Sequence, residues 1–297
     1  MIARRSASAY VALAVLALVW GYTWVVIKIA TRDASPYVVA GSRIAVAAAV
    51  LFAVLALTRR SLRPTPLGPT IVLGLLQTTG FTVFQTVAVS MAGAGKTAVL
   101  AYTMPFWVAI LAWPFLGERI AGLRWVALGL AAVGLAFVVA PLDLRSLPAD
   151  AFAVIAGLSW GASSVWAKRL RARHDVELLS LTAWQLLWGA IPMIVLMFAV
   201  PGQYVHWTPA FVVAMAFMSV LGGALAWLLW LFILSRLPAG VAGIASLATP
   251  VVGVVAAAIQ LHEIPSATEV IGMACIMVAL ALNALPARRS PARLTAR

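Results

Sequence analysis

Ten apolar runs follow one another along this chain, and the short segments between them hold most of its charged residues. Each run is close to the ~20 residues that an α-helix needs to cross the hydrocarbon core of a bilayer. Their continuity argues against the alternating ~10-residue strands of a membrane barrel. The chain is 64% hydrophobic and 10% charged, whereas soluble domains carry about 25% charged residues, so we predict an all-α integral membrane protein. The ten expected transmembrane helices are residues 10–29, 36–57, 68–91, 95–116, 123–140, 151–168, 178–200, 209–234, 239–261 and 267–285.

An internal repeat divides these spans into two halves of five. A Trp-Gly pair occurs in the first span of each half, as Trp20-Gly21 and Trp160-Gly161. Because five is an odd number, the second half must enter the membrane from the opposite side. We therefore expect two inverted five-helix repeats, residues 1–145 and 146–297, around a central cavity. Three residues of the fourth span recur 145 residues later: Gly95, Pro105 and Glu118 match Gly240, Pro250 and Glu263.

The basic residues are distributed unevenly between the two sides of the predicted membrane. Of the 21 Lys and Arg residues, sixteen lie on the side of the amino terminus and four on the other side. Cytoplasmic loops carry such an excess, so we expect a multi-pass protein of a bacterial-type inner (plasma) membrane with both termini in the cytoplasm. The clustering of these residues between apolar runs argues against a nucleic-acid partner, despite a formal net charge of +13.

Two features give the chain a family resemblance. Each half opens with a Trp-Gly pair in its first span, and each carries a proline followed thirteen residues later by a glutamate at the end of its fourth span. With ten spans in two halves, the chain resembles the drug/metabolite transporter superfamily, in its ten-helix amino-acid and metabolite exporter branch, over residues 10–285. The resemblance implies export of small metabolites, often amino acids or hydrophobic compounds, across the inner membrane.

Most ionisable side chains are predicted to lie outside the membrane core. All eight carboxylates and all three histidines fall in loops or at span ends, whereas proton-coupled transporters place such groups within spans. The sequence therefore predicts no evident proton-coupling carboxylate, no metal site, no cofactor and no enzymatic acid–base pair. Arg43, inside the second span, is the exception. It could bind a substrate carboxylate, but we favour a side chain that snorkels outward or meets carbonyls of a neighbouring helix.

Charged residues and prolines at corresponding places suggest gates and kinks. Inversion of the halves places Lys28 and Glu263 at the outer mouth of a central pathway, and Lys168 and Glu118 at the inner mouth. We expect each pair to approach when its side closes; the alternative is that all four are solvated span ends. The gate or helix-kink residues are therefore Lys28, Pro105, Glu118, Lys168, Pro250 and Glu263.

Aromatic and amide side chains in mid-span suggest a substrate pocket. Gln77, Phe81 and Gln85 are spaced four residues apart, so they share one helix face, and amides facing lipid would be unfavourable. The alternative is that the amides join helices and the rings only pack. The expected substrate-binding residues lie on the first, third and fourth spans of the halves: Trp20, Gln77, Phe81, Gln85, Tyr102, Trp160, Trp227 and Trp230.

Together these features predict a monomeric secondary transporter that works by alternating access. It would export small metabolites, and amino acids with aromatic or large apolar side chains would suit rings and amides best. Its partners would be a small-molecule substrate and the lipid bilayer. Two alternatives stay open: an exporter of hydrophobic drugs or cations, and a membrane-embedded binding or assembly protein with a closed core.

Overall fold

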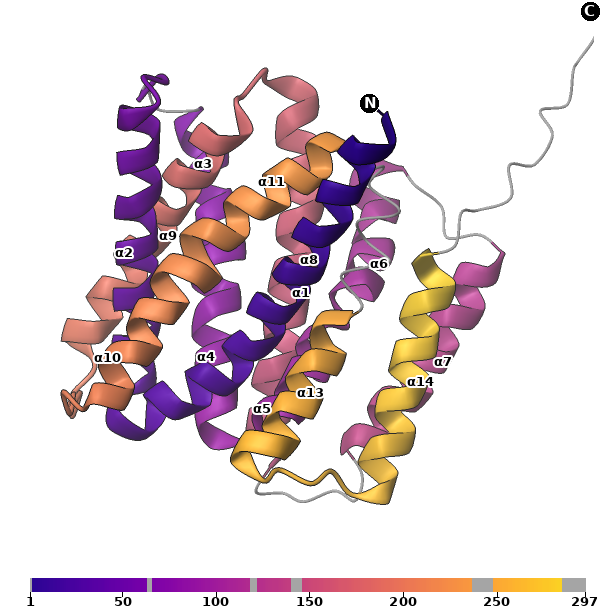
Figure 1. Cartoon of the computed structure of the whole chain (residues 1–297). Coiled ribbons are helices and arrows are strands. Elements are labelled where there is room, and N and C mark those ends of the chain that lie inside the picture. The colour runs from indigo at the N-terminus through magenta and orange to yellow at the C-terminus, as the bar shows by residue number, and fades with distance from the viewer. Residues whose placement is uncertain (1, 63–65, 118–121, 140–145, 237–247, 285–297) are drawn as a thin grey trace, which may run out of the picture.

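A computed structural model of the chain describes residues 2–62, 66–117, 122–139, 146–236 and 248–284, which form a bundle of helices (Figure 1). Within these residues no strand forms, and one isolated bridge joins Ala34 to Val205. The first half contains α1 (Ile2–Asp33), α2 (Pro36–Leu57), α3 (Leu67–Leu73), η1 (Gly74–Gly80), α4 (Phe81–Met91), α5 (Ala94–Ala101), α6 (Met104–Leu116) and α7 (Leu123–Val139). The second half contains α8 (Leu147–Arg173), α9 (Leu178–Ala199), α10 (Pro209–Ala216), η2 (Phe217–Leu225), α11 (Ala226–Arg236), α13 (Ala248–Leu261) and α14 (Ala267–Ala284).

Several of these helices are suited to a bilayer. α7, α13 and α14 contain shorter apolar stretches, so the count of ten spans and the inversion of the halves stay predictions. The all-α integral membrane architecture agrees with the sequence-based expectation. Six segments of the described chain are long and apolar enough to cross a membrane: Val11–Asp33, Pro36–Leu57, Leu67–Met91, Ala94–Leu116, Leu178–Ala199 and Pro209–Trp230.

The fourth predicted span is not one continuous helix, because a turn at Tyr102–Thr103 separates α5 from α6. Pro105, expected in mid-helix, is instead the second residue of α6, where a missing N–H is tolerated. Proline cannot donate to the Ala101 carbonyl four residues earlier. That carbonyl faces α8, at a point where a β-carbon on Gly157 would lie only 2.7 Å away. Pro250 is the third residue of α13.

The third span of each half contains a π-helical segment that the sequence reasoning missed. These segments are η1 and η2, and a π-segment changes the backbone hydrogen-bond ladder in a way often found at functional sites. The Leu76 carbonyl in η1 accepts a 2.7 Å hydrogen bond from Ser159 Oγ of α8. The Gly222 carbonyl in η2 accepts one of 3.1 Å from Trp20 Nε1 of α1. The first helix of each half is thus bonded to the π-segment of the other half.

The two Trp-Gly pairs pack in the same way against the opposite half. A β-carbon at Gly21 would lie 2.6 Å from the Val252 side chain, and one at Gly161 would lie 2.6 Å from the Trp107 side chain. Val252 follows Trp107 by 145 residues, the offset of the repeat. Glycine is needed at both places because any side chain would separate the crossing helices. Corresponding helices also meet across the molecule, since α2 packs on α9 and α7 on α14.

One end of the bundle, where α1 ends and α2 begins, is named here the Asp33 face. The Asp33 carbonyl accepts a 2.7 Å hydrogen bond from the His206 amide, and its carboxylate accepts one of 2.6 Å from Thr208 Oγ1. Ser35 N donates to the Tyr204 carbonyl at 3.1 Å. These bonds tie the α1–α2 corner to the connection between α9 and α10. The amino terminus lies at the opposite end of α1 (Figure 1).

Candidate functional site

A cavity lies between the two halves, lined by α1, α2, η1, α4, the α5–α6 turn, α8, α9, η2 and α11. Its volume, measured for the centre of a water-sized sphere, is about 100 Å³. One water molecule needs ~10–15 Å³ by the same measure, so the cavity has room for several. The lining is mostly apolar with a few convergent polar groups, as in small-molecule sites generally. Seven of the eight expected substrate-binding residues line it: Trp20, Gln77, Phe81, Gln85, Tyr102, Trp160 and Trp227.

Trp230 is the expected pocket residue that does not line the cavity. Its ring lies behind Trp20, with centroids 6.1 Å apart, and so supports a lining residue. The sequence reasoning also missed lining residues, among them Thr23, Trp24 and Gln185. Trp24 follows Trp20 by four residues, so a search for helix faces could have found it.

Rings from both halves form two groups in the cavity wall. In the first group, Trp160 of α8 lies between Phe81 of η1–α4 and Tyr102 of the α5–α6 turn, at centroid distances of 4.9 and 5.6 Å. In the second group, Trp20 of α1 makes an edge contact with Trp227 of α11 at 5.6 Å. Tyr102 is available to the cavity because the fourth span breaks at this residue. The geometry offers ring faces and edges to an apolar group.

Arg43 faces the cavity and does not snorkel outward, but it meets a carbonyl oxygen of a neighbouring helix, which is the other part of our preferred interpretation. It is only 6% exposed, and its Nη2 donates to Gln85 Oε1 at 2.8 Å. Its Nε has no hydrogen-bond partner in the structure. The available signal was the rule that a charged residue within a transmembrane helix faces the protein interior.

The cavity is sealed toward the Asp33 face. The lining residues nearer this face, which include Trp24, Arg43 and Tyr102, are at most 6% exposed, whereas Trp20 and Trp160, farther from it, are only partly buried. A buried apolar cluster continues from the cavity to the face along α1, α2, α4 and α5. It includes Val25, Val26, Ile27, Ala30, Val38, Val39, Val89, Ala94 and Ala98.

Two of the expected gate residues hold the turn between α4 and α5 at the Asp33 face. Lys28 Nζ donates to the carbonyls of Val89 and Ala92 at 2.9 and 2.7 Å, at the C-terminus of α4. Glu263 Oε2 accepts from the amide of Gly95 at 3.2 Å, at the N-terminus of α5. Each charge matches the dipole of the helix end that it contacts. Lys28 and Glu263 thus contact the same turn, and no ion pair joins them in this state, so their direct approach stays a prediction.

The second expected pair is Lys168 and Glu118. Lys168 lies near the C-terminus of α8 and is exposed. Glu118 lies outside the described residues. The proposed contact between the two therefore stays a prediction from the sequence.

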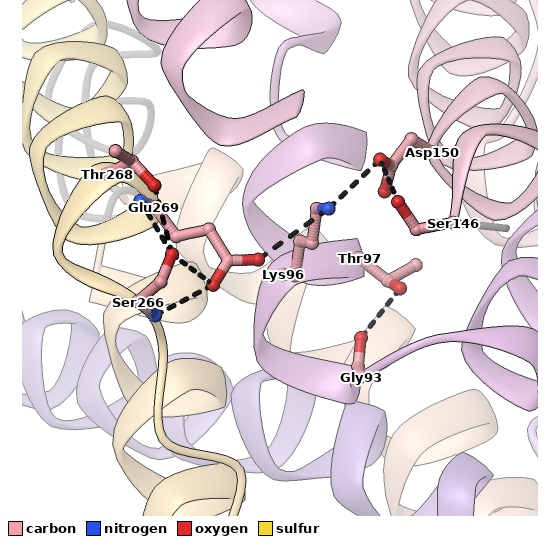
Figure 2. A network of polar contacts seen from close by, with 8 residues as sticks. All are labelled: Gly93, Lys96, Thr97, Ser146, Asp150, Ser266, Thr268 and Glu269. Atoms are coloured by element: carbon pink, nitrogen blue, oxygen red, sulfur yellow. Dashed lines mark hydrogen bonds and ion pairs between the residues drawn. The ribbon is translucent and has the colours of Figure 1, made fainter. Parts of the chain in front are cut away.

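A charged network that the sequence reasoning missed joins three helix starts (Figure 2). Lys96 Nζ of α5 lies 2.9 Å from Asp150 Oδ2 of α8 and 3.6 Å from Glu269 Oε1 of α14. Asp150 also accepts from Ser146 Oγ at 3.4 Å, and Ser266 N donates to Glu269 Oε2 at 2.8 Å. Both carboxylates lie in the first turn of their helices, where the helix dipole favours negative charge.

The described residues do not gather metal ligands, since no group of three His, Cys, Asp or Glu side chains among them could hold an ion. The cavity wall also lacks carboxylates and histidines among its described residues. What the site offers is rings, amides, hydroxyls and one guanidinium. These groups can bind a small solute with an apolar part and a polar part.

Comparison with known proteins agrees with this arrangement. The sequence profile of the EamA-like transporter family matches twice, over residues 7–140 and 147–285. The chain is 29% identical to the uncharacterized transporter YoaV of Bacillus subtilis (strain 168) over 275 residues, which cover 90% of this chain and 93% of YoaV. It is 26% identical to the uncharacterized transporter YvbV of the same organism, over 91% of this chain and 89% of YvbV.

A solved crystal structure of a protein has a similar fold. It overlays on this structure with a TM-score of 0.65 at 20% sequence identity, covering 93% of this chain and 96% of that chain. At this identity the likeness concerns the fold alone. The helical arrangement is therefore shared along nearly the whole length of both chains.

Proposed function

The chain belongs to the EamA-like transporter family, and from this premise we propose that it is a secondary transporter that exports amino acids with aromatic or large apolar side chains. As a member of this family it is a multi-pass membrane transporter and not an enzyme. Its partners are a small-molecule substrate and the lipid bilayer. The proposal adds the substrate class, the direction of transport and the mechanism.

The observation that carries the proposal is the composition of the cavity wall. Phe81, Tyr102 and Trp160 form a contiguous group of rings beside the amide of Gln85. Aromatic pairs contribute roughly 0.5–1.5 kcal/mol beyond the burial of their area, so an aromatic solute gains more here than alanine does. A strongly anionic sugar phosphate would find rings where it needs several cations. A zwitterion with an apolar side chain matches both the rings and the polar groups.

Alternating access is supported by the asymmetry between the two ends of the cavity. The Asp33 face is sealed by a buried apolar cluster, and the partly exposed lining residues lie farther from it. With both termini in the cytoplasm, as the basic residues predict, this is a state closed to the outside. The matching contacts of Gly21 and Gly161 support inverted halves, and exchange of their two conformations would open the other side.

The proposal is tested by flux through the purified protein in proteoliposomes. We expect uptake of radiolabelled phenylalanine and leucine to exceed that of alanine, and a hexose phosphate not to be carried. Protein-free liposomes give the background rate for each solute. Equal flux of alanine and phenylalanine, or flux of the sugar phosphate alone, would contradict the proposed substrate class.

A further inference from the structure

Arg43 is the only charged residue among the described residues that line the cavity. It lies on α2, the eighth residue after Ser35, and its side chain reaches Gln85 on α4. Only 6% of the surface of Arg43 is exposed. The guanidinium is therefore held inside the protein at the wall of the proposed substrate site.

The hydrogen-bonding capacity of this guanidinium is not satisfied by the protein. Nη2 donates to the neutral amide oxygen of Gln85, and Nε has no partner. The ion pairs of the described residues all lie elsewhere. No carboxylate among the described residues therefore neutralises the charge of Arg43. A buried charge is unfavourable unless it is paired and hydrogen-bonded. The missing anion is thus most simply supplied by the solute.

We infer that Arg43 binds the carboxylate of the transported solute, and that this carboxylate is obligatory for recognition whereas an ammonium group is not. The inference rests on the proposed function and names the polar group that the site recognises. A guanidinium presents its N–H groups in a planar fork that matches the two oxygens of a carboxylate. By contrast, the described cavity wall holds no carboxylate that could pair with an ammonium.

The arrangement around Arg43 places the two ends of the solute. Gln85 holds the guanidinium near the sealed side, and Phe81 lies one helical turn away on the same face. Phe81 contacts Trp160, whose ring is partly buried and farther from the Asp33 face. A carboxylate on Arg43 would therefore lie at the closed end of the cavity, with the apolar group along the rings. A hydrophobic cation would be repelled by the guanidinium, which argues against the alternative that the protein exports cations.

The first test uses four related compounds as competitors of phenylalanine flux in proteoliposomes. They are phenylalanine, 3-phenylpropionate, phenylalaninamide and phenethylamine, of which only the first two carry a carboxylate. We expect 3-phenylpropionate to compete, and the amide and the amine to compete roughly 10- to 100-fold more weakly, as the loss of a hydrogen bond to a charged group implies. Competition by phenethylamine equal to that by phenylalanine would overturn the inference while leaving amino-acid transport intact.

Variants then assign the preference to Arg43. In Gln85→Glu, a near-isosteric change, a carboxylate would lie on the Arg43 side chain and take the place of the solute's own. In this variant we expect that 3-phenylpropionate no longer competes with phenylalanine and that phenethylamine does. Arg43→Gln should lose the preference for compounds with a carboxylate, and Arg43→Lys should keep part of this preference because the charge remains. Arg32→Gln removes one exposed positive charge from α1 outside the cavity and should leave the preference unchanged.

A binding measurement separates this inference from the proposed function. The purified protein is heated in detergent with 3-phenylpropionate or with phenethylamine, and the shift in Tm is recorded, since a ligand that binds the folded state stabilises it. If neither phenylalanine nor leucine is carried but 3-phenylpropionate alone raises Tm in the wild type and not in Arg43→Gln, the substrate proposal fails and the carboxylate site stands. Equal Tm shifts with the two compounds would overturn the carboxylate site.

Discussion

The ammonium of Lys96 lies 2.9 Å from the carboxylate of Asp150, so a largely buried ion pair joins the two sequence halves. The Asp150 side chain is 3% exposed. Lys96→Met would leave that carboxylate buried without its cation, and breaking such a pair destabilises a protein on the order of 3 kcal/mol. We expect a clearly lower Tm in detergent.

A matched control for this variant is the ion pair of Arg60 and Glu177, whose side chains are 53% and 39% exposed. Exposed pairs contribute about 0–1 kcal/mol, so Arg60→Met should change Tm little. The double variant Lys96→Met/Asp150→Asn should recover part of the loss, because neither charge remains. A Tm for Lys96→Met equal to that for Arg60→Met would show that the network does not stabilise the fold.

Removing one ring should change which solutes are carried. Trp160 contacts Phe81 and Tyr102, and each ring pair contributes roughly 0.5–1.5 kcal/mol. Trp160→Ala should therefore lower kcat/KM for phenylalanine about tenfold while changing alanine flux much less. Trp230→Ala is the control, because Trp230 contacts Trp20 without lining the cavity. Equal losses for both solutes in Trp160→Ala would indicate a general gating defect instead.

The seal at the Asp33 face should depend on Glu263. Its carboxylate accepts from the Gly95 amide at the start of α5, and such a charge at a helix N-terminus contributes about 0.3–1 kcal/mol. Glu263→Gln should open the seal more often, so that Ala98→Cys, at a buried position, reacts up to about fivefold faster with an impermeant thiol reagent. The native Cys275 is replaced by alanine in this experiment.

The control for the seal is Glu269→Gln, which alters a carboxylate of the Lys96 network and leaves the Gly95 contact in place. Its labelling rate should stay near that of the Ala98→Cys parent. A Glu263→Gln rate that does not differ from the parent would remove the assigned role of this carboxylate in closure.

Orientation in the membrane follows from the distribution of basic residues. Reporters fused after Arg63 and after Arg297 should both report the cytoplasm, and one inserted between residues 201 and 209 should report the periplasm. Residues 204–208 belong to the Asp33 face, so this experiment also identifies the sealed side. A cytoplasmic result for residues 201–209 would contradict the proposed inversion.

Coupling to a proton gradient is not expected. The described cavity wall holds neither a carboxylate nor a histidine, the groups that carry protons in most coupled transporters. With equal phenylalanine on both sides of a proteoliposome, an imposed pH gradient should produce no net accumulation. Accumulation would reveal a coupling group that lies outside the cavity wall.

The sequence by itself determined the class of the protein and much of its pocket. Runs of apolar residues fix helices in a bilayer, because backbone groups there can bond only within the protein, and the predicted span at residues 36–57 coincides with α2. The spacing of Gln77, Phe81 and Gln85 is local information, and it placed all three on the cavity wall. Family membership followed from the same repeated motifs.

The tertiary structure alone decided which distant groups meet. Arg43 and Gln85 are 42 residues apart, and Lys96 reaches Asp150 and Glu269 on two other helices. The turn at Tyr102 and the π-segments likewise depend on partners such as Gly157, Ser159 and Trp20 in other helices. A helical pattern shows which face of a span is polar. The burial of a charge and the identity of its partner arise only when separate helices pack. Those contacts join residues far apart in the sequence, and their free energies depend on the groups that surround them.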